Sequence, residues 1–133
     1  MPAILSGELL LTELDHARLL KLNGGVLPAP LLALLEDASL VPSPAIPQHV
    51  VTMYSQVSVS HNDGEALQKL TLCYPGDAEP VEGFISVLSP VGAALLGREV
   101  GTTVAWTSPA GTERRMTIEA ILFQPEASGD YST

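Results

Sequence analysis

The 133-residue chain is poor in several residue types, and each shortage excludes a class of protein. Its single cysteine, Cys73, excludes an internal disulfide framework and provides no metal-ligand spacing. Lys and Arg number 6 against 15 Asp and Glu, for a formal net charge of −9. Proteins that hold nucleic acid through its phosphates need clustered basic residues, so direct nucleic-acid binding is not expected. Aromatic residues make up only 5% of the chain, so aliphatic side chains must build most of the core.

Long apolar runs are also missing. The run Leu9-Leu10-Leu11 is much too short for a signal-peptide core or a membrane span, and no basic segment precedes it. We therefore expect a cytoplasmic protein without a membrane partner. The acidic charge is compatible with docking on a basic protein surface, although solubility is the simpler explanation.

The first 40 residues have the pattern of two short helices. Thr12 is a candidate N-cap for a helix over 13–22, which ends at Asn23-Gly24-Gly25, a strong stop signal. A second helix is expected to begin near Pro28 or Pro30, with its leucines on one face. Two such helices joined by a Gly-Gly turn predict an antiparallel hairpin over 1–40 with arms of about 15–18 Å.

The remainder of the chain has the pattern of a sheet domain. Three prolines within 41–47 predict an extended linker. Residues 48–133 then show strand patterns, at about 51–59, 66–74, 83–88, 101–106 and 113–123. His61-Asn62-Asp63-Gly64 is typical of a hairpin turn. The last strand is expected to turn four side chains inward, those of Met116, Ile118, Ala120 and Leu122.

One short helix is predicted among these strands. Ser89 is a candidate N-cap, Pro90 suits the first helical position, and Gly97 is typical of a left-handed helix stop. Several strands around a single short helix predict an α+β domain with a mostly antiparallel sheet.

The same segment carries a family resemblance. Ile85-Ser86-Val87-Leu88-Ser89-Pro90-Val91-Gly92-Ala93-Ala94-Leu95-Leu96-Gly97, followed by Val100-Gly101, resembles the C-terminal domain shared by Gre-type transcript-cleavage factors and Rnk proteins, the regulators of nucleoside diphosphate kinase. Three further stretches resemble Rnk specifically, namely Pro47-Gln48-His49-Val50-Val51-Thr52-Met53, Leu72-Cys73-Tyr74-Pro75 and Gln124-Pro125-Glu126-Ala127-Ser128-Gly129-Asp130-Tyr131. The resemblance is clear from about 47 to 131 and looser in the N-terminal part.

The resemblance implies a fold and a function. The fold is an FKBP-like domain over 48–133, preceded by a coiled-coil-like hairpin over 1–40. The function is that of a bacterial transcription regulator that binds RNA polymerase near its secondary channel. The family name also implies an effect on nucleoside diphosphate kinase, and direct contact with that kinase is the alternative function.

The hairpin tip decides whether Gre-type catalysis is expected. Gre-type factors carry acidic residues at the tip of a long hairpin, where carboxylates can hold a metal ion that assists hydrolysis. Here the tip, Asn23-Gly24-Gly25, has no carboxylate, and the nearest acids are expected to be capping or solvated residues toward the base, namely Glu13, Asp15, Glu36 and Asp37. The sequence therefore predicts a non-enzymatic regulator that competes with Gre-type factors without stimulating cleavage.

The sequence offers no residues that indicate another kind of catalysis or ligand binding. The three histidines are isolated from one another and from Cys73, and no phosphate-binding loop is present, so no metal or cofactor is expected. An FKBP-like fold raises prolyl isomerase activity as a third function, which would need an aromatic-lined pocket. The aromatic candidates are more simply core residues, namely Tyr74, Phe84, Trp106 and Phe123.

The partner-binding residues are chosen around the short helix. We expect the contact surface to include Ser89-Pro90-Val91-Gly92 together with the basic residues Arg98, Arg114 and Arg115. Exposed charges that only keep the protein soluble explain these arginines equally well.

Overall fold

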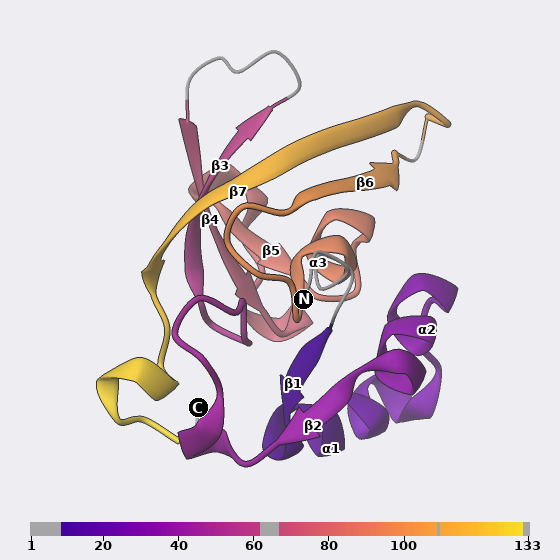
Figure 1. Ribbon diagram of the computed structural model, residues 1–133. Helices are drawn as coiled ribbons and strands as arrows, with labels where there is room; N and C mark the ends of the chain where they lie inside the picture. Colours follow the sequence, from indigo (N-terminus) through magenta and orange to yellow (C-terminus); the bar gives the residue numbers. More distant parts are fainter. Residues whose placement is uncertain (1–8, 62–66, 109, 132–133) are drawn as a thin grey trace.

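The computed structural model describes residues 9–61, 67–108 and 110–131 (Figure 1). Its helices and strands are, in chain order, β1 (Leu10–Thr12), α1 (Glu13–Lys21), α2 (Ala29–Asp37), β2 (Ser39–Val41), β3 (Gln56–His61), β4 (Leu67–Cys73), β5 (Phe84–Ser86), α3 (Pro90–Leu95), β6 (Thr103–Thr107) and β7 (Glu113–Phe123). The hairpin turn predicted at 61–64 lies almost wholly outside the described residues. No helix in the described ranges is long and apolar enough to cross a membrane.

The two N-terminal helices lie where the sequence predicts them. Thr12 caps α1 by accepting a hydrogen bond from the Asp15 N–H at 3.0 Å. The helix gives way to a tight turn in which Asn23 and Gly24 have left-handed φ values of 54° and 67°. After the turn, α2 begins at Ala29 with Pro30 in its first turn. These helix ends confirm the local predictions, while the coiled-coil-like pairing of the two helices stays a prediction.

A small parallel sheet, which the sequence did not predict, holds the helical segment together. β1 precedes α1 and β2 follows α2, and the two strands pair in parallel, with Leu10 opposite Ser39. The pairing brings the two ends of the α1–α2 segment side by side (Figure 1). β2 uses residues that the sequence placed at the end of the second helix and the start of the linker.

The larger sheet has five strands in the order β5-β4-β3-β7-β6. All neighbouring strands are antiparallel except β4 and β5, which confirms a mostly antiparallel α+β domain. Two register shifts interrupt the pairing of β3 with β7. They reverse the alternation near the end of β7, so Ile121 packs against the core and Leu122 is 48% exposed. The prediction that Leu122 points inward was therefore wrong.

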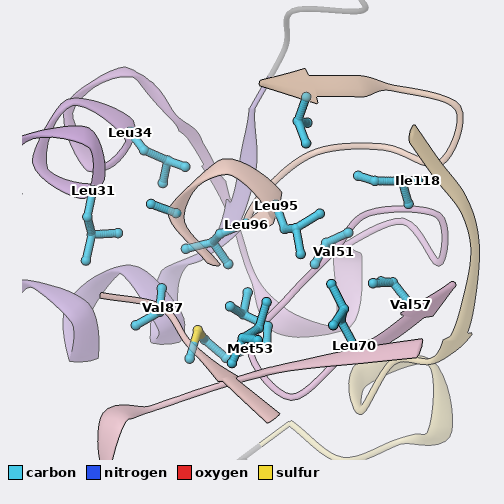
Figure 2. Close-up of a cluster of buried hydrophobic side chains, with 14 of the residues drawn as sticks. Leu31, Leu34, Val51, Met53, Val57, Leu70, Val87, Leu95, Leu96 and Ile118 are labelled. Carbon is cyan, nitrogen blue, oxygen red and sulfur yellow. The ribbon is translucent and has the colours of Figure 1, made fainter. Parts of the chain in front are cut away.

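One hydrophobic core joins the N-terminal and C-terminal segments. It contains Leu19 of α1 and Leu31, Leu34 and Leu35 of α2 together with side chains from the large sheet and α3. Figure 2 shows Leu31 and Leu34 facing the same cluster as Leu95, Leu96 and Val87. Burial of these apolar surfaces, at about 25 cal/mol per Å², is the main force that fixes the helices on the sheet.

Two predictions about the start and edge of the large sheet need correction. Strand β3 begins at Gln56, not near Val51, because Tyr54 has φ 67° and the Thr52 N–H donates to Ser55 Oγ in a tight turn. The prediction that Phe84 and Phe123 are core residues was also wrong. Phe84 lies on the edge strand β5 and Phe123 at the end of β7, and they are 37% and 48% exposed.

Helix α3 begins as predicted. Ser89 Oγ accepts the Gly92 N–H at 3.1 Å and donates to the Ser86 carbonyl at 2.7 Å. Gly92 is buried against the preceding strand, and a Cβ atom there would lie 2.1 Å from the Ser86 oxygen. This close approach requires a glycine and fixes α3 against β5.

Replacing Ser89 with alanine tests this cap. Ser89→Ala should lower the free energy of unfolding by about 1 kcal/mol, because the Gly92 N–H loses its acceptor. Chemical denaturation measures the change. The matched control is Ser39→Ala at an exposed position of β2, which should be nearly neutral. Equal stability of Ser89→Ala and wild type would show that the cap does not stabilise α3.

Candidate functional site

A groove of about 410 Å³ lies between α2, α3 and β6. Its walls are mostly apolar, formed by Leu9, Pro30, Ala33, Leu34, Pro90, Ala93, Ala94, Ala105 and Trp106, with Asp37, Arg98 and Thr107 adding polar groups. A smaller hollow of about 180 Å³ continues along the start of β6, where Ala94 and Arg98 also contribute. We call the two together the β6 groove. It is the surface on which the residues predicted to bind a partner partly converge.

The structure separates the predicted partner-binding residues into two kinds. Ser89 and Gly92 fix the backbone of α3, and Val91 packs against the core. Pro90 is exposed, and Pro90 and Arg98 line the β6 groove. Gly92 is buried and Ser89 and Val91 are half-buried, so within α3 Pro90 is the exposed member of this set.

Arg114 and Arg115 point to opposite faces of the β6–β7 ribbon. Arg114 lies opposite Trp106 in the register, on the face that carries the buried Met116, whereas Arg115 lies opposite Ala105. Arg115 also pairs with Glu113, two residues away on its own face, at 3.6 Å. Both members of this pair are well exposed, so it contributes little to stability. Only Arg114 shares the face on which Trp106 borders the groove.

Sequence reasoning found one wall of the groove and missed the others. The helix motif identified Pro90, but nothing in the sequence indicated that α2 lies across from it. Trp106 was interpreted as a core residue, and it does pack partly against the core while it lines the groove. Only the chain path through the β1–β2 pair brings these segments together.

The predicted hairpin tip has no carboxylate in the structure. All three residues at Asn23-Gly24-Gly25 are exposed, and Asn23 Nδ2 donates to the Val26 carbonyl at 2.8 Å to close the turn. Of the acids expected to be capping or solvated residues, Glu13, Glu36 and Asp37 are exposed. Asp15 instead is 1% exposed, so it is not a solvated residue, and of the two expected roles only capping fits it, because its N–H donates to Thr12 at the start of α1.

Asp15 belongs to a buried polar cluster that the sequence did not indicate. Its carboxylate accepts the Met53 N–H at 3.2 Å and so joins α1 to the turn that precedes β3. Burial, and then the nearby Glu126, raise the pKa of Asp15 from 3.8 to about 6, although the Met53 N–H and Arg18 oppose the shift. Glu126 accepts a hydrogen bond from Thr52 Oγ1 at 2.8 Å, which extends the cluster to the C-terminal segment.

The remaining candidates for chemistry lie in the core or are isolated. Cys73 is fully buried, its thiol donates weakly to the Ile85 carbonyl at 3.4 Å, and burial raises its pKa. A thiol in this environment is a poor nucleophile. Among the described residues, no three His, Cys, Asp or Glu side chains are grouped so as to hold a metal ion.

The fold and the sequence together define the class of protein. The family model "Transcription elongation factor, GreA/GreB, C-term" matches residues 46–123. A solved GreA/GreB transcription elongation factor from Nitrosomonas europaea superposes with a TM-score of 0.71 at 34% identity, over 87% of this chain and 100% of that one. The chain belongs to this GreA/GreB family, which confirms the resemblance seen in its sequence.

Within the family, the chain is similar to the regulator of nucleoside diphosphate kinase (Rnk) of Escherichia coli strain K12. The two are 39% identical over 98 residues, which is 73% of this chain and 71% of that protein. The transcription elongation factor GreA of Solidesulfovibrio magneticus is 38% identical over 74 residues, but the match covers only 45% of its length. These relatives are named as regulators and transcription factors.

The buried carboxylate predicts an unusual pH dependence. Because the folded state raises the pKa of Asp15, folding favours its protonated form, so this group stabilises the protein below pH 4 and loses that effect as pH rises to about 6. The shift corresponds to about 3 kcal/mol at neutral pH. Asp15→Asn keeps an acceptor for Met53 without the charge, so it should raise the free energy of unfolding at pH 7 by up to about 3 kcal/mol and little at pH 4.

Denaturation at a series of pH values measures this difference. Glu13→Gln, which neutralises an exposed acid in the same helical turn, is the control and should show no comparable gain. A difference between Asp15→Asn and wild type that stays constant from pH 4 to pH 7 would contradict the argument.

Proposed function

We propose that the protein is a non-catalytic transcription regulator that binds RNA polymerase near its secondary channel and competes with Gre-type factors without stimulating transcript cleavage. Membership of the GreA/GreB family supports binding to RNA polymerase. The tip at Asn23-Gly24-Gly25, which has no carboxylate, supports the absence of cleavage. We also propose that residues 48–133 act as the docking domain, with the helical segment 1–40 joined to it through residues 41–47.

Two independent obstacles stand against cleavage. The first is chemical, since this exposed turn lacks a carboxylate, the negatively charged oxygen ligand that would hold an active-site metal ion. The second is reach. Helices α1 and α2 have 9 residues each, so each is only about 13 Å long. Their buried leucines also keep them on the core.

The β6 groove supports the choice of contact surface. Pro90 and Arg98 line it, Arg114 lies on the neighbouring strand opposite Trp106, and the groove is concave and largely apolar. Ser89, Val91 and Gly92 contribute by holding α3 in place, and Arg115 faces away. The formal net charge of −9 favours docking on a basic partner surface and disfavours binding to free nucleic acid.

A direct action on nucleoside diphosphate kinase is the second candidate function. It is favoured by the similarity to Rnk proteins, whose name refers to that kinase. The name is equally compatible with an indirect effect through transcription. A pull-down with the two purified proteins distinguishes direct contact from an indirect effect.

Prolyl isomerase activity has less support. Among the described residues that line the β6 groove, Trp106 is the one aromatic side chain, whereas Phe84 and Phe123 lie elsewhere on the surface. An isomerisation assay with a proline peptide tests this third function.

Binding to core RNA polymerase is the first prediction of this proposal. The purified protein should displace a labelled Gre factor from polymerase, and the apparent Kd of the Gre factor should rise in proportion to the competitor concentration. Arg98→Glu and Arg114→Glu should each weaken competition several-fold, whereas Arg115→Glu, on the opposite face, should not. Simultaneous binding of both proteins to polymerase would contradict a shared site.

Transcript cleavage is the second prediction. A stalled elongation complex with labelled RNA should show no shortened RNA when the wild-type protein is added, while a Gre factor supplies the positive control. The double variant Asn23→Asp, Val26→Glu places carboxylates at exposed tip positions and leaves the left-handed Gly24 untouched. It should also be inactive, because the arms stay short.

The result of the cleavage assay distinguishes the missing carboxylate from the short reach of the helices. Cleavage with the wild-type protein would overturn the non-catalytic proposal. Cleavage with the double variant alone would show that reach is not limiting.

A further inference from the structure

The two edges of the five-stranded sheet differ in whether other parts of the chain pair with them. At one edge, Glu79 pairs with Phe84, and their backbone groups exchange hydrogen bonds of 2.8 and 3.1 Å that cover the first residue of β5. At the other edge lies β6, which pairs with β7 on one side only. Within the described part of the chain, no strand or bridge is paired with its outer side.

The backbone groups that face outward from β6 can be assigned from the register. Ile118 N–H donates to the Thr102 carbonyl and Ser108 N–H to the Thr112 carbonyl, so hydrogen bonding to β7 falls on the even-numbered residues of β6. The N–H and C=O groups of Thr103, Ala105 and Thr107 therefore point away from the sheet. They form a row of donors and acceptors that matches an added strand.

Natural proteins protect such edges, but the residues of β6 itself provide little of this protection. A charged side chain, a proline or a short length commonly blocks pairing at an edge strand. The five residues of β6 are Thr103-Val104-Ala105-Trp106-Thr107, with no charge and no proline. β-Branched and aromatic residues of this kind favour strand pairing.

The β6 groove limits what can occupy the edge. Its walls include the small side chains Ala93 and Ala94 of α3, and α2 contributes Pro30 and Ala33 across from β6. A segment that pairs with β6 thus lies between the strand and a helix. A strand of a second copy would bring its own sheet neighbour toward α2, which lines the far side of the groove, so a single extended chain is the favoured occupant.

The charges around the strand indicate the composition of that chain. Three of the six basic residues flank β6, with Arg98 beside its first half and Arg114 opposite Trp106. Asp37 lines the groove together with Arg98 and Trp106 and offsets the Arg98 charge there, whereas Arg114 lies on the Trp106 face of the ribbon beside the uncharged Val104 and Met116. The chain as a whole carries a net charge of −9, but at this face the nearest charge is that of Arg114, which attracts an acidic side chain as a local complementary charge.

We propose that the β6 edge binds an extended, acidic peptide segment of a protein partner as a sixth strand. Alternate apolar side chains of the peptide enter the groove beside Trp106, and a carboxylate meets Arg114. Main-chain pairing supplies affinity and the groove supplies selectivity, as in other cases of strand addition. The proposal goes beyond polymerase binding and does not depend on it, because it is tested on the isolated protein.

The experiment uses the full chain and a phage-displayed library of random nine-residue peptides. Selected peptides are synthesised, and their binding is followed by fluorescence of Trp106, the one tryptophan of the chain. We expect sequences that alternate apolar and polar residues and carry an acidic residue near one end. A library that yields no binder, or binders with apolar residues at helical spacing, would overturn the proposal.

Variants at the edge and beside it localise the site. Ala105→Pro removes the central outward N–H and should weaken binding at least tenfold, whereas Ala105→Thr keeps that donor and should bind like wild type. Ala94→Phe fills the groove without altering the edge and should also weaken binding, which guards against misfolding of the proline variant. Circular dichroism checks the fold of each variant.

Charge reversal at two neighbouring arginines tests whether the acidic residue of the peptide binds Arg114. Arg114→Glu should weaken binding of the selected acidic peptide about fivefold or more, and Arg115→Glu, on the opposite face of the ribbon, should leave it unchanged. Binding that survives both Ala105→Pro and Ala94→Phe would place the peptide elsewhere and overturn the proposal. Equal loss in both arginine variants would contradict the role of Arg114.

Discussion

The backbone of Gly97 joins three segments that are far apart in the sequence. Its N–H donates to the Val51 carbonyl at 2.9 Å, and its carbonyl accepts the Leu10 N–H at 3.1 Å. The residue has φ 81°, and a Cβ atom there would lie 3.2 Å from the Leu10 oxygen. The end of α3, strand β1 and the segment before β3 therefore meet at a position that only glycine fills without strain. Because β1 pairs with β2, this junction also determines where α2 lies across the β6 groove.

Buried polar groups tie the connecting segments to the sheet where apolar packing does not. Gln124 donates to the carbonyls of Pro47 and Val50 at 2.8 and 2.7 Å, which satisfies oxygens of a proline-rich path that has few donors of its own. Asp15 and Thr52 bind the neighbouring turn in the same way. The buried Asp15 charge opposes folding at neutral pH, whereas Gln124 is uncharged and its buried Oε1, which has no hydrogen-bond partner among the described residues, carries the smaller cost of a neutral polar atom. The linker is thus held by side chains from both ends of the chain.

The motif that makes the family recognisable consists largely of structural residues. Ser89 caps α3, Gly92 permits its close approach to β5, and Gly97 forms the junction described above. Such residues are required by the fold whatever partner is bound. The proposed contact surface lies beside them, where Pro90, Trp106 and Arg98 line the groove next to the unpaired edge of β6. A regulator can therefore keep the framework of its family and differ from its relatives in what it binds.

The sequence by itself determined the features that depend on a few neighbouring residues. The caps at Thr12 and Ser89 and the turn at Asn23-Gly24-Gly25 act within about four residues, so both ends of α1 and the starts of α2 and α3 could be predicted, as could the absence of a carboxylate at the tip. The tertiary structure alone decided the parallel pairing of β1 with β2, the register shifts that turn Leu122 outward, the burial of Asp15 and the groove between α2 and β6. These features depend on contacts between distant segments, whose energies are individually small and leave no local pattern in the sequence.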